Sequence, residues 1–182
     1  MIVRRLSLTE LSKLHIAAGF SRWVSTDDAK GKIELKRKLK KFISEKKDVW
    51  CAVDNGYLIG YGIVDDLAEL PGGKTLETLE VAQNYRRRGI GSIILNRILG
   101  EYGEALMAVV PFPEFGYEKE LEEFYRRHGF KKFSEDLMFR FPSDAEKLRK
   151  WITYLDELLD TYKTLRKKMA SELPSSIKFN PQ

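Results

Sequence analysis

Residues 81–95 read Val-Ala-Gln-Asn-Tyr-Arg-Arg-Arg-Gly-Ile-Gly-Ser-Ile-Ile-Leu, and this stretch decides the fold. The end of an apolar strand pattern runs into three arginines, and a Gly-Ile-Gly loop then opens a helix with apolar periodicity. A helix N-terminus presents unpaired backbone N–H groups and partial positive charge. Because Gly89 and Gly91 have no Cβ, the backbone there can approach a ligand closely. The stretch therefore predicts a seat for a di- or polyphosphate.

Composition indicates one globular domain with a full core. The chain has 182 residues, of which 43% are apolar and 32% charged. No apolar run approaches the roughly 20 residues that span a bilayer, and the N-terminal residues do not resemble a signal peptide. The one cysteine, Cys51, excludes an internal disulfide and suits a reducing compartment. We therefore expect a cytoplasmic protein, and the abundance of Lys and Glu over Gln and Asn suggests heat adaptation.

The net charge of +5 raises the possibility of a nucleic-acid partner. Much of the excess lies in residues 30–47, where lysines surround an apolar stripe at helical spacing. A solvated helix face is the preferred interpretation, because no base-stacking aromatic pattern or zinc-finger spacing accompanies the lysines. His15 and His128 have no neighbours at metal-ligand spacing, so no metal is expected.

Hydrophobic periodicity predicts an α/β protein of the α+β kind. Asn55-Gly56 is a strong hairpin signal between two strand patterns. Strands are predicted at 1–7, 48–53, 57–64, 75–81, 105–110 and 133–141, and helices at 9–18, 30–47, 90–102 and 118–127. This order predicts an antiparallel meander followed by strand–helix–strand–helix–strand, in one mixed, mostly antiparallel sheet with helices on both faces.

The pattern changes after Pro142. Apolar residues at steps of three and four run from Leu148 to Met169, with Ser143 or Asp144 as a cap and Pro174 as the end of the helix. We therefore divide the chain into a domain of residues 1–141 and an extension of residues 142–182. The extension either packs on the domain or forms a homodimer, and the chain is a monomer in the first case.

Two common phosphate-binding classes do not fit. A dinucleotide fold needs a third glycine after Gly-x-Gly and an acidic residue about 20 residues further on. A P-loop needs Gly-Lys-Ser/Thr at the end of its loop. Neither pattern is present in residues 86–92.

Two motifs resemble the GNAT superfamily of acetyl-CoA-dependent N-acetyltransferases. Residues 86–91, Arg-Arg-Arg-Gly-Ile-Gly, resemble its Gln/Arg-x-x-Gly-x-Gly/Ala loop, and residues 79–81, Leu-Glu-Val, resemble the end of its central strand. Residues 124–130, Phe-Tyr-Arg-Arg-His-Gly-Phe, resemble its Phe-Tyr-x-x-x-Gly-Phe segment. The resemblance covers residues 1–141 and implies a GNAT-like central sheet of six to seven strands, with the C-terminal helix as an addition.

The resemblance implies that acetyl-CoA is the cosubstrate and that a primary amine attacks its thioester directly. The loop would hold the coenzyme pyrophosphate, and the strand would pair with the pantetheine arm and help to stabilise the oxyanion. The residues that would bind the coenzyme are Leu79, Glu80, Val81, Arg86, Arg87, Arg88, Gly89, Ile90, Gly91, Ser92 and Tyr125.

Two proton transfers accompany that reaction. By position, Tyr125 is the candidate acid for the departing thiolate, although a tyrosine on this helix face also suits the core. Glu80 and Glu77 are candidate bases for the amine, and strand alternation predicts that their side chains have opposite orientations, so that only one of them faces the cleft. Glu114 is a third candidate, and a water chain could serve instead.

The sequence does not indicate the acceptor. It departs from the family pattern at Glu118, where many members of the family have an asparagine. The amine could belong to a small molecule, a peptide or a protein. A non-catalytic acyl-CoA sensor on the same fold is the alternative function, and a basic nucleic-acid binder is a weaker one.

Overall fold

The computed structural model describes residues 1–68, 70 and 72–172. Within these residues the strands are β1 (Ile2–Arg5), β2 (His15–Ile16), β3 (Asp48–Asp54), β4 (Tyr57–Asp66), β5 (Lys74–Val81), β6 (Met107–Val109), β7 (Lys131–Lys132) and β8 (Met138–Arg140). The helices are α1 (Leu8–Lys13), α2 (Ala29–Ser44), α3 (Ile90–Tyr102), α4 (Glu118–Arg127) and α5 (Ala145–Glu172), and η1 (Gln83–Tyr85) is a 3₁₀ turn.

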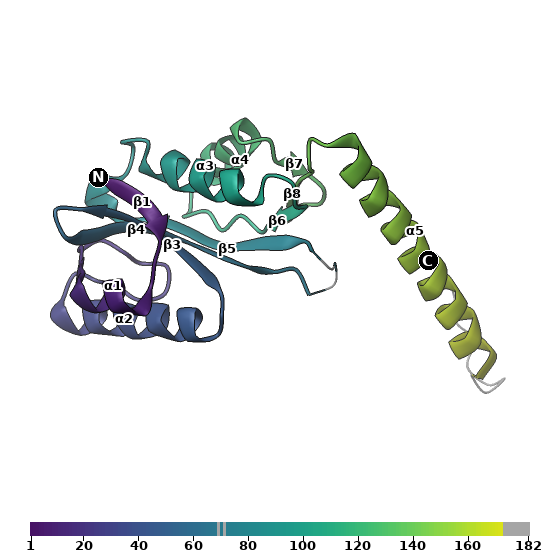
Figure 1. Cartoon of the computed structure of the whole chain (residues 1–182), viewed down its shortest axis with the longest axis horizontal. Coiled ribbons are helices and arrows are strands. Elements are labelled where there is room, and N and C mark those ends of the chain that lie inside the picture. The colour runs from purple at the N-terminus through teal and green to yellow at the C-terminus, as the bar shows by residue number, and fades with distance from the viewer. Residues whose placement is uncertain (69, 71, 173–182) are drawn as a thin grey trace. The chain divides into compact units, whose positions relative to one another are not determined.

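The strands form one mixed sheet in the order β1-β3-β4-β5-β6-β8-β7, and β2 adds to β4. Pairing is antiparallel except between β5 and β6 and between β2 and β4. Helices α1 and α2 lie on one face, and α3 and α4 on the other (Figure 1). The predicted class is confirmed, and the two-residue strands β2 and β7 bring the described sheet to eight strands.

Two glycines in β4 let α3 approach the sheet. A Cβ on Gly62 would lie 2.8 Å from Ile98 Cδ1, and a Cβ on Gly60 would lie 2.9 Å from Ile94 Cδ1. Both isoleucines are completely buried. Helix α3 therefore covers this face of the central strands closely, and a substrate must reach them from elsewhere.

Two sequence predictions about element boundaries are wrong. The first helix begins at the predicted place, because Ser7 and Glu10 form a capping box, but it ends at Lys13 instead of reaching residue 18. Residues 15–16 are drawn into β2 by pairing with the start of β4. The strand predicted at 133–141 is instead a short hairpin, β7 and β8, because Phe133 and Ser134 N–H donate to Leu137 O in its turn.

The described chain divides into two compact units, with the boundary between Phe141 and Pro142. The second unit holds α5, and Asp144 caps it by accepting from Lys147 N–H at 2.8 Å, as predicted. Pro174, the predicted end of this helix, and the Met169 side chain lie outside the described residues. No helix in the described part of the chain is both long and apolar enough to cross a membrane.

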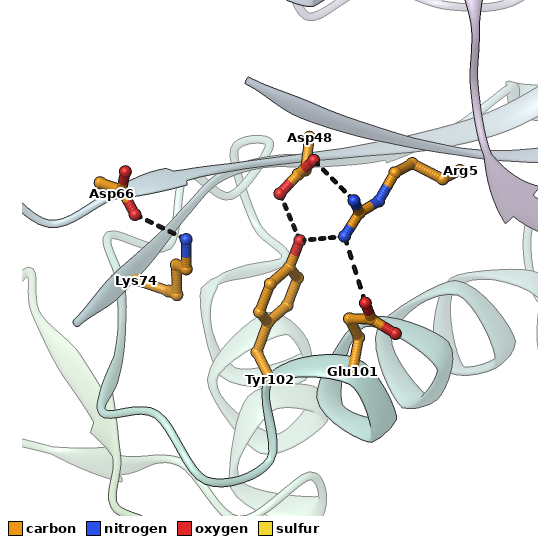
Figure 2. Close-up of polar contacts among 6 residues, drawn as sticks. All are labelled: Arg5, Asp48, Asp66, Lys74, Glu101 and Tyr102. Carbon is orange, nitrogen blue, oxygen red and sulfur yellow. Dashed lines mark hydrogen bonds and ion pairs between the residues drawn. The ribbon is translucent and has the colours of Figure 1, made fainter. Parts of the chain in front are cut away.

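Polar side chains join the C-terminal end of α3 to the sheet (Figure 2). Arg5 on β1 forms ion pairs of 3.3 Å with Asp48 on β3 and with Glu101 on α3. The Tyr102 hydroxyl donates a short hydrogen bond to Asp48 and accepts one of 2.8 Å from Arg5. Burial and the bond to Asp48 raise the pKa of Tyr102 to about 12, so the neutral hydroxyl is favoured in the fold.

Candidate active site

Strands β5 and β6 separate at the place where the sequence analysis expects the coenzyme to bind. Strands β5 and β6 pair only through Lys74, Thr75 and Leu76 of β5, and β6 ends at Val109. Pro111 and Pro113 then follow, and neither has a backbone N–H to continue a ladder. The edge of β5 beyond Leu76 therefore has no strand partner on the β6 side within the described chain.

Backbone alternation shows which groups this open edge presents. Ala82 N–H donates to Ile59 O of β4, and Glu80 lies opposite Tyr61 in the same ladder. Every second residue of an antiparallel strand bonds to the same neighbour, so the backbone groups of Glu80 face β4. Those of Leu79 and Val81 face the open edge. Of the three strand residues expected to bind the coenzyme through the backbone, Leu79 and the N–H of Val81 can do so and Glu80 cannot, and the Val81 carbonyl already accepts from Arg86 Nε.

A β-bulge changes the direction of the acidic side chains. Ile63 pairs with Thr78, but the next residue, Val64, pairs with Leu76, so Glu77 is the extra residue on β5. The carboxylates of Glu77 and Glu80 therefore point to the same face, the one that carries α2. The prediction that Glu77 and Glu80 have opposite side-chain orientations is wrong, because simple alternation does not hold across a bulge.

Glu80 is buried and holds a loop. Its side chain is 8% exposed, and Oε1 accepts hydrogen bonds from Ser21 N–H at 2.7 Å and Arg22 N–H at 2.9 Å. Oε2 accepts one of 2.6 Å from the hydroxyl of Tyr61, which is completely buried. Burial and the Glu80 charge raise the pKa of Tyr61 far above its usual value, so this hydroxyl remains a donor. Glu80 thus joins β5 to the loop before α2.

Glu77 lies in a more open environment. Its carboxylate forms an ion pair of 2.6 Å with Lys47, which also contacts Asp65 at 2.8 Å. Lys47 follows α2, so these contacts join that helix to the bulged part of the sheet. The two carboxylates hold the pKa of Lys47 above its usual value against the effect of burial.

The arginine-glycine loop has the geometry of an anion seat. Arg87 has a φ of 59° and Gly89 a φ of 77°, both in the left-handed region. Gly89 is the N-cap of α3 without a side-chain cap, and Ile93 N–H is bonded to Gly89 O. The N–H groups of residues 90–92, Ile90, Gly91 and Ser92, belong to the first turn and lack carbonyl partners within the helix. They are available to a bound anion.

The three arginines of the loop have different environments. Arg86 is engaged by protein groups, since its Nε donates to Val81 O at 3.0 Å and its Nη1 pairs with Glu114 at 2.8 Å. Arg87 and Arg88 are exposed, and their guanidinium carbons lie 5.9 Å from the Tyr117 ring and 5.5 Å from the Tyr85 ring. Charge for a coenzyme phosphate is therefore available from Arg87 and Arg88, whereas Arg86 and Glu114 neutralise one another.

Tyr125 of α4 lies in the core. It is 4% exposed and its ring packs against the rings of Phe124 and Phe130, with centroids 5.2 and 5.5 Å away. Burial raises the pKa of Tyr125, and the positive charge of Arg22 counteracts part of the effect. A raised pKa keeps the hydroxyl protonated, which a proton donor requires.

Arg22 is a candidate site residue that sequence reasoning missed. It lies in the loop before α2, and its guanidinium stands 4.0 Å from the centre of the Phe112 ring. It belongs to no recognisable motif, so only the fold shows that it lies close enough to influence Tyr125 and Tyr61.

Glu118 and His128, which the sequence analysis considered without assigning them a role, lie near the two ends of α4. Glu118 is exposed at the start of α4, where its carboxylate accepts a hydrogen bond of 3.0 Å from Gly116 N–H and has its pKa lowered by backbone donors. His128 directly follows α4 and is half-buried, and its Nδ1 lies 2.7 Å from Phe124 O. No group of three or more metal-binding side chains occurs among the residues that the structure describes.

Comparison with known proteins identifies the class. Residues 45–132 match the acetyltransferase (GNAT) domain family, a span that holds β5, the arginine-glycine loop and Tyr125. This match confirms the resemblance to the GNAT superfamily that the motifs show. A search of curated protein sequences gives no significant match.

Solved structures share the fold at low identity. The acetoin utilization protein from Exiguobacterium sibiricum is 17% identical over 84% of each chain, with a TM-score of 0.63. An aminoglycoside 6'-N-acetyltransferase complexed with coenzyme A is 16% identical over 77% of this chain and 96% of its own, with a TM-score of 0.54. A GNAT family acetyltransferase from Brucella melitensis in complex with acetyl-CoA is 15% identical over 76% and 85%, with a TM-score of 0.50.

Proposed function

We propose that this protein is an N-acetyltransferase that moves the acetyl group of acetyl-CoA to a primary amine. The observation that carries the proposal is the position of an anion seat directly after an open strand edge. The backbone of Leu79 and Val81 faces a side of β5 that β6 leaves unpaired, and the α3 N-terminus begins at Ile90. Two of the solved neighbours contain coenzyme A or acetyl-CoA, which supports the choice of cosubstrate.

The coenzyme is held by backbone more than by side chains in this proposal. The N–H groups of residues 90–92 bind the pyrophosphate, and Arg87 and Arg88 add charge. The pantetheine arm lies along β5 and pairs with the backbone of Leu79 and with the N–H of Val81.

The acetyl transfer needs no enzyme nucleophile. The amine nitrogen attacks the thioester carbon, a C–N bond forms, and backbone N–H groups of β5 stabilise the oxyanion. The C–S bond then breaks, and the Tyr125 hydroxyl gives its proton to the coenzyme thiolate. Helix α3 covers the opposite face of the sheet, so the amine enters from the face that carries Glu77 and Glu80.

Glu77 and Glu80 are the carboxylates that we propose for removing the proton of the amine. Both lie on the acceptor face, but Glu80 already accepts three hydrogen bonds and is nearly buried. Glu77 is less enclosed, with 29% of its side chain exposed. We therefore assign direct or water-mediated proton removal to Glu77 first, and a positioning role to Glu80.

A comparison of Tyr125→Phe with the unchanged protein tests the proposed function. Acetyl-CoA binding is measured by calorimetry, and transfer is measured as thiol release with a panel of amines. Tyr125→Phe should bind acetyl-CoA normally and lose roughly 100-fold or more in kcat. Tyr57→Phe, a change on the exposed start of β4, is the matched control and should behave as the parent does.

Two results would contradict the proposal. If the unchanged protein binds acetyl-CoA but acetylates no amine of the panel, the fold serves as an acyl-CoA sensor. If Tyr125→Phe transfers acetyl at the full rate, the proton of the thiolate does not come from Tyr125.

A further inference from the structure

A hollow beside the β5 bulge has room for a small acceptor. Its volume is about 430 Å³, and it opens on the face that carries Glu77. It is lined by Arg22, Trp23, Phe42, Lys47, Thr75, Leu76, Glu77 and Val110. The lining combines two aromatic side chains with two cations and a single carboxylate, so the hollow favours a molecule that is partly apolar and partly charged.

The two cations of the hollow are not equivalent. Lys47 is neutralised, because Glu77 and Asp65 lie 2.6 and 2.8 Å from its Nζ. Arg22 has no carboxylate within ion-pair distance among residues 1–68, 70 and 72–172. Arg22 is therefore the cation of the hollow that has no carboxylate partner among the described residues, and its side chain is half-buried.

Arg22 is held firmly at this place. Its backbone N–H is fixed by Glu80 at 2.9 Å, and its guanidinium stands 4.0 Å from the Phe112 ring centre and 5.6 Å from that of Trp23. Thr26, which is completely buried, closes the same loop by accepting from Phe20 N–H and donating to Ala17 O. Contact with aromatic faces leaves the N–H edge of a guanidinium free for a ligand.

We propose that the acceptor is an amine that also bears a carboxylate, and that Arg22 binds this carboxylate within the hollow. The amine then points toward Glu77, and the carbon chain between the two groups lies against Trp23 and Phe42. One unpaired guanidinium matches one negative charge, and its two parallel N–H donors match the two carboxylate oxygens. The inference rests on the proposed acetyltransferase function and names its substrate class.

The test uses pairs of amines that differ only in the acidic group, such as an amino acid and its carboxamide. The full-length protein should acetylate the carboxylate member with roughly 10- to 100-fold higher kcat/KM, the range of one strong charged contact. Arg22→Gln should remove this preference by raising KM for the carboxylate amine, whereas KM for the carboxamide should change by less than about threefold. Arg22→Lys should restore part of the preference, because lysine keeps the positive charge but lacks the two parallel N–H donors of a guanidinium.

Arg37→Gln is the matched control, since Arg37 is an exposed arginine of α2 that pairs with Glu34. It should leave both members of each pair unchanged. The inference is overturned if the parent protein does not discriminate within the pairs, or if Arg22→Gln lowers kcat for both members equally, which would place Arg22 at the thioester. If acetyl-CoA binds and no amine of any pair is acetylated, the proposed function fails and the inference fails with it.

Discussion

Replacing Glu80 by alanine removes the carboxylate that joins β5 to the loop before α2. Three donors lose their acceptor in this variant, namely Ser21 N–H, Arg22 N–H and the Tyr61 hydroxyl. The two loop N–H groups lie near the surface and can turn to water. The Tyr61 hydroxyl cannot, because that side chain has no exposed surface.

The expected loss of stability follows from these environments. A buried donor without a partner costs about 1–3 kcal/mol, and each hydrogen bond to a charged group contributes about 1.5–3 kcal/mol. Allowing for water at the two loop donors, we expect Glu80→Ala to lower the free energy of unfolding by about 3–5 kcal/mol. In a chain of this size that corresponds to a fall in Tm of roughly 6–20 °C.

Urea unfolding at neutral pH, followed by circular dichroism, measures this change. Glu80→Gln should cost less than the alanine variant, because the amide oxygen still accepts from the loop. Glu101→Gln is the control, since Glu101 is about half exposed and its 3.3 Å contact with Arg5 is a surface ion pair worth at most about 1 kcal/mol. A loss below about 1 kcal/mol for Glu80→Ala would refute the reasoning that Glu80 anchors the loop.

Further predictions concern the α3 end, the loop and the domain boundary. The pKa of Tyr102 is raised to about 12, so its stabilising effect is complete below pH 10 and is lost as the pH rises toward 12. Tyr102→Phe should therefore lower the free energy of unfolding by about 1–2 kcal/mol in urea at pH 7. The variant should also lose less stability than the parent protein between pH 10 and 12, and an equal loss in both proteins would contradict this. Gly89→Ala should destabilise by about 1 kcal/mol, because φ is 77°, and weaken coenzyme A binding measured by calorimetry; normal binding would show that the loop backbone is not the seat. A chain that ends at Phe141 should fold and bind coenzyme A. If circular dichroism shows that this truncated chain is unfolded, the second unit is needed for folding.

Several elements could be predicted because local chemistry determines them. Asn55-Gly56 has positive φ at both residues, 47° and 79°, as a two-residue hairpin turn requires. Gly89 is the cap of α3, as its place before an apolar-periodic helix indicated. Asp28 caps α2 by accepting from Gly31 N–H at 2.7 Å, as an aspartate directly before a helix can. In each case the signal lies within a few residues of the feature.

The rest of the site depends on contacts between distant parts of the chain. The bulge that turns Glu77 and Glu80 to one face is a property of the β4–β5 ladder and has no local signature. Arg86 is separated from Glu114 by 28 positions, so its neutralisation could not be read from the loop. Arg22 is similarly placed by Glu80, a residue 58 positions away.

Residue-resolved amide hydrogen exchange, measured with and without coenzyme A, tests the central claim most directly. The account predicts added protection at the amides of Leu79 and Val81 and at those of residues 90–92, which face the open edge and the anion seat. The Glu80 amide faces β4 and should change little. Saturating coenzyme A that leaves Leu79, Val81 and residues 90–92 unprotected would contradict the account, because the coenzyme would then lie elsewhere.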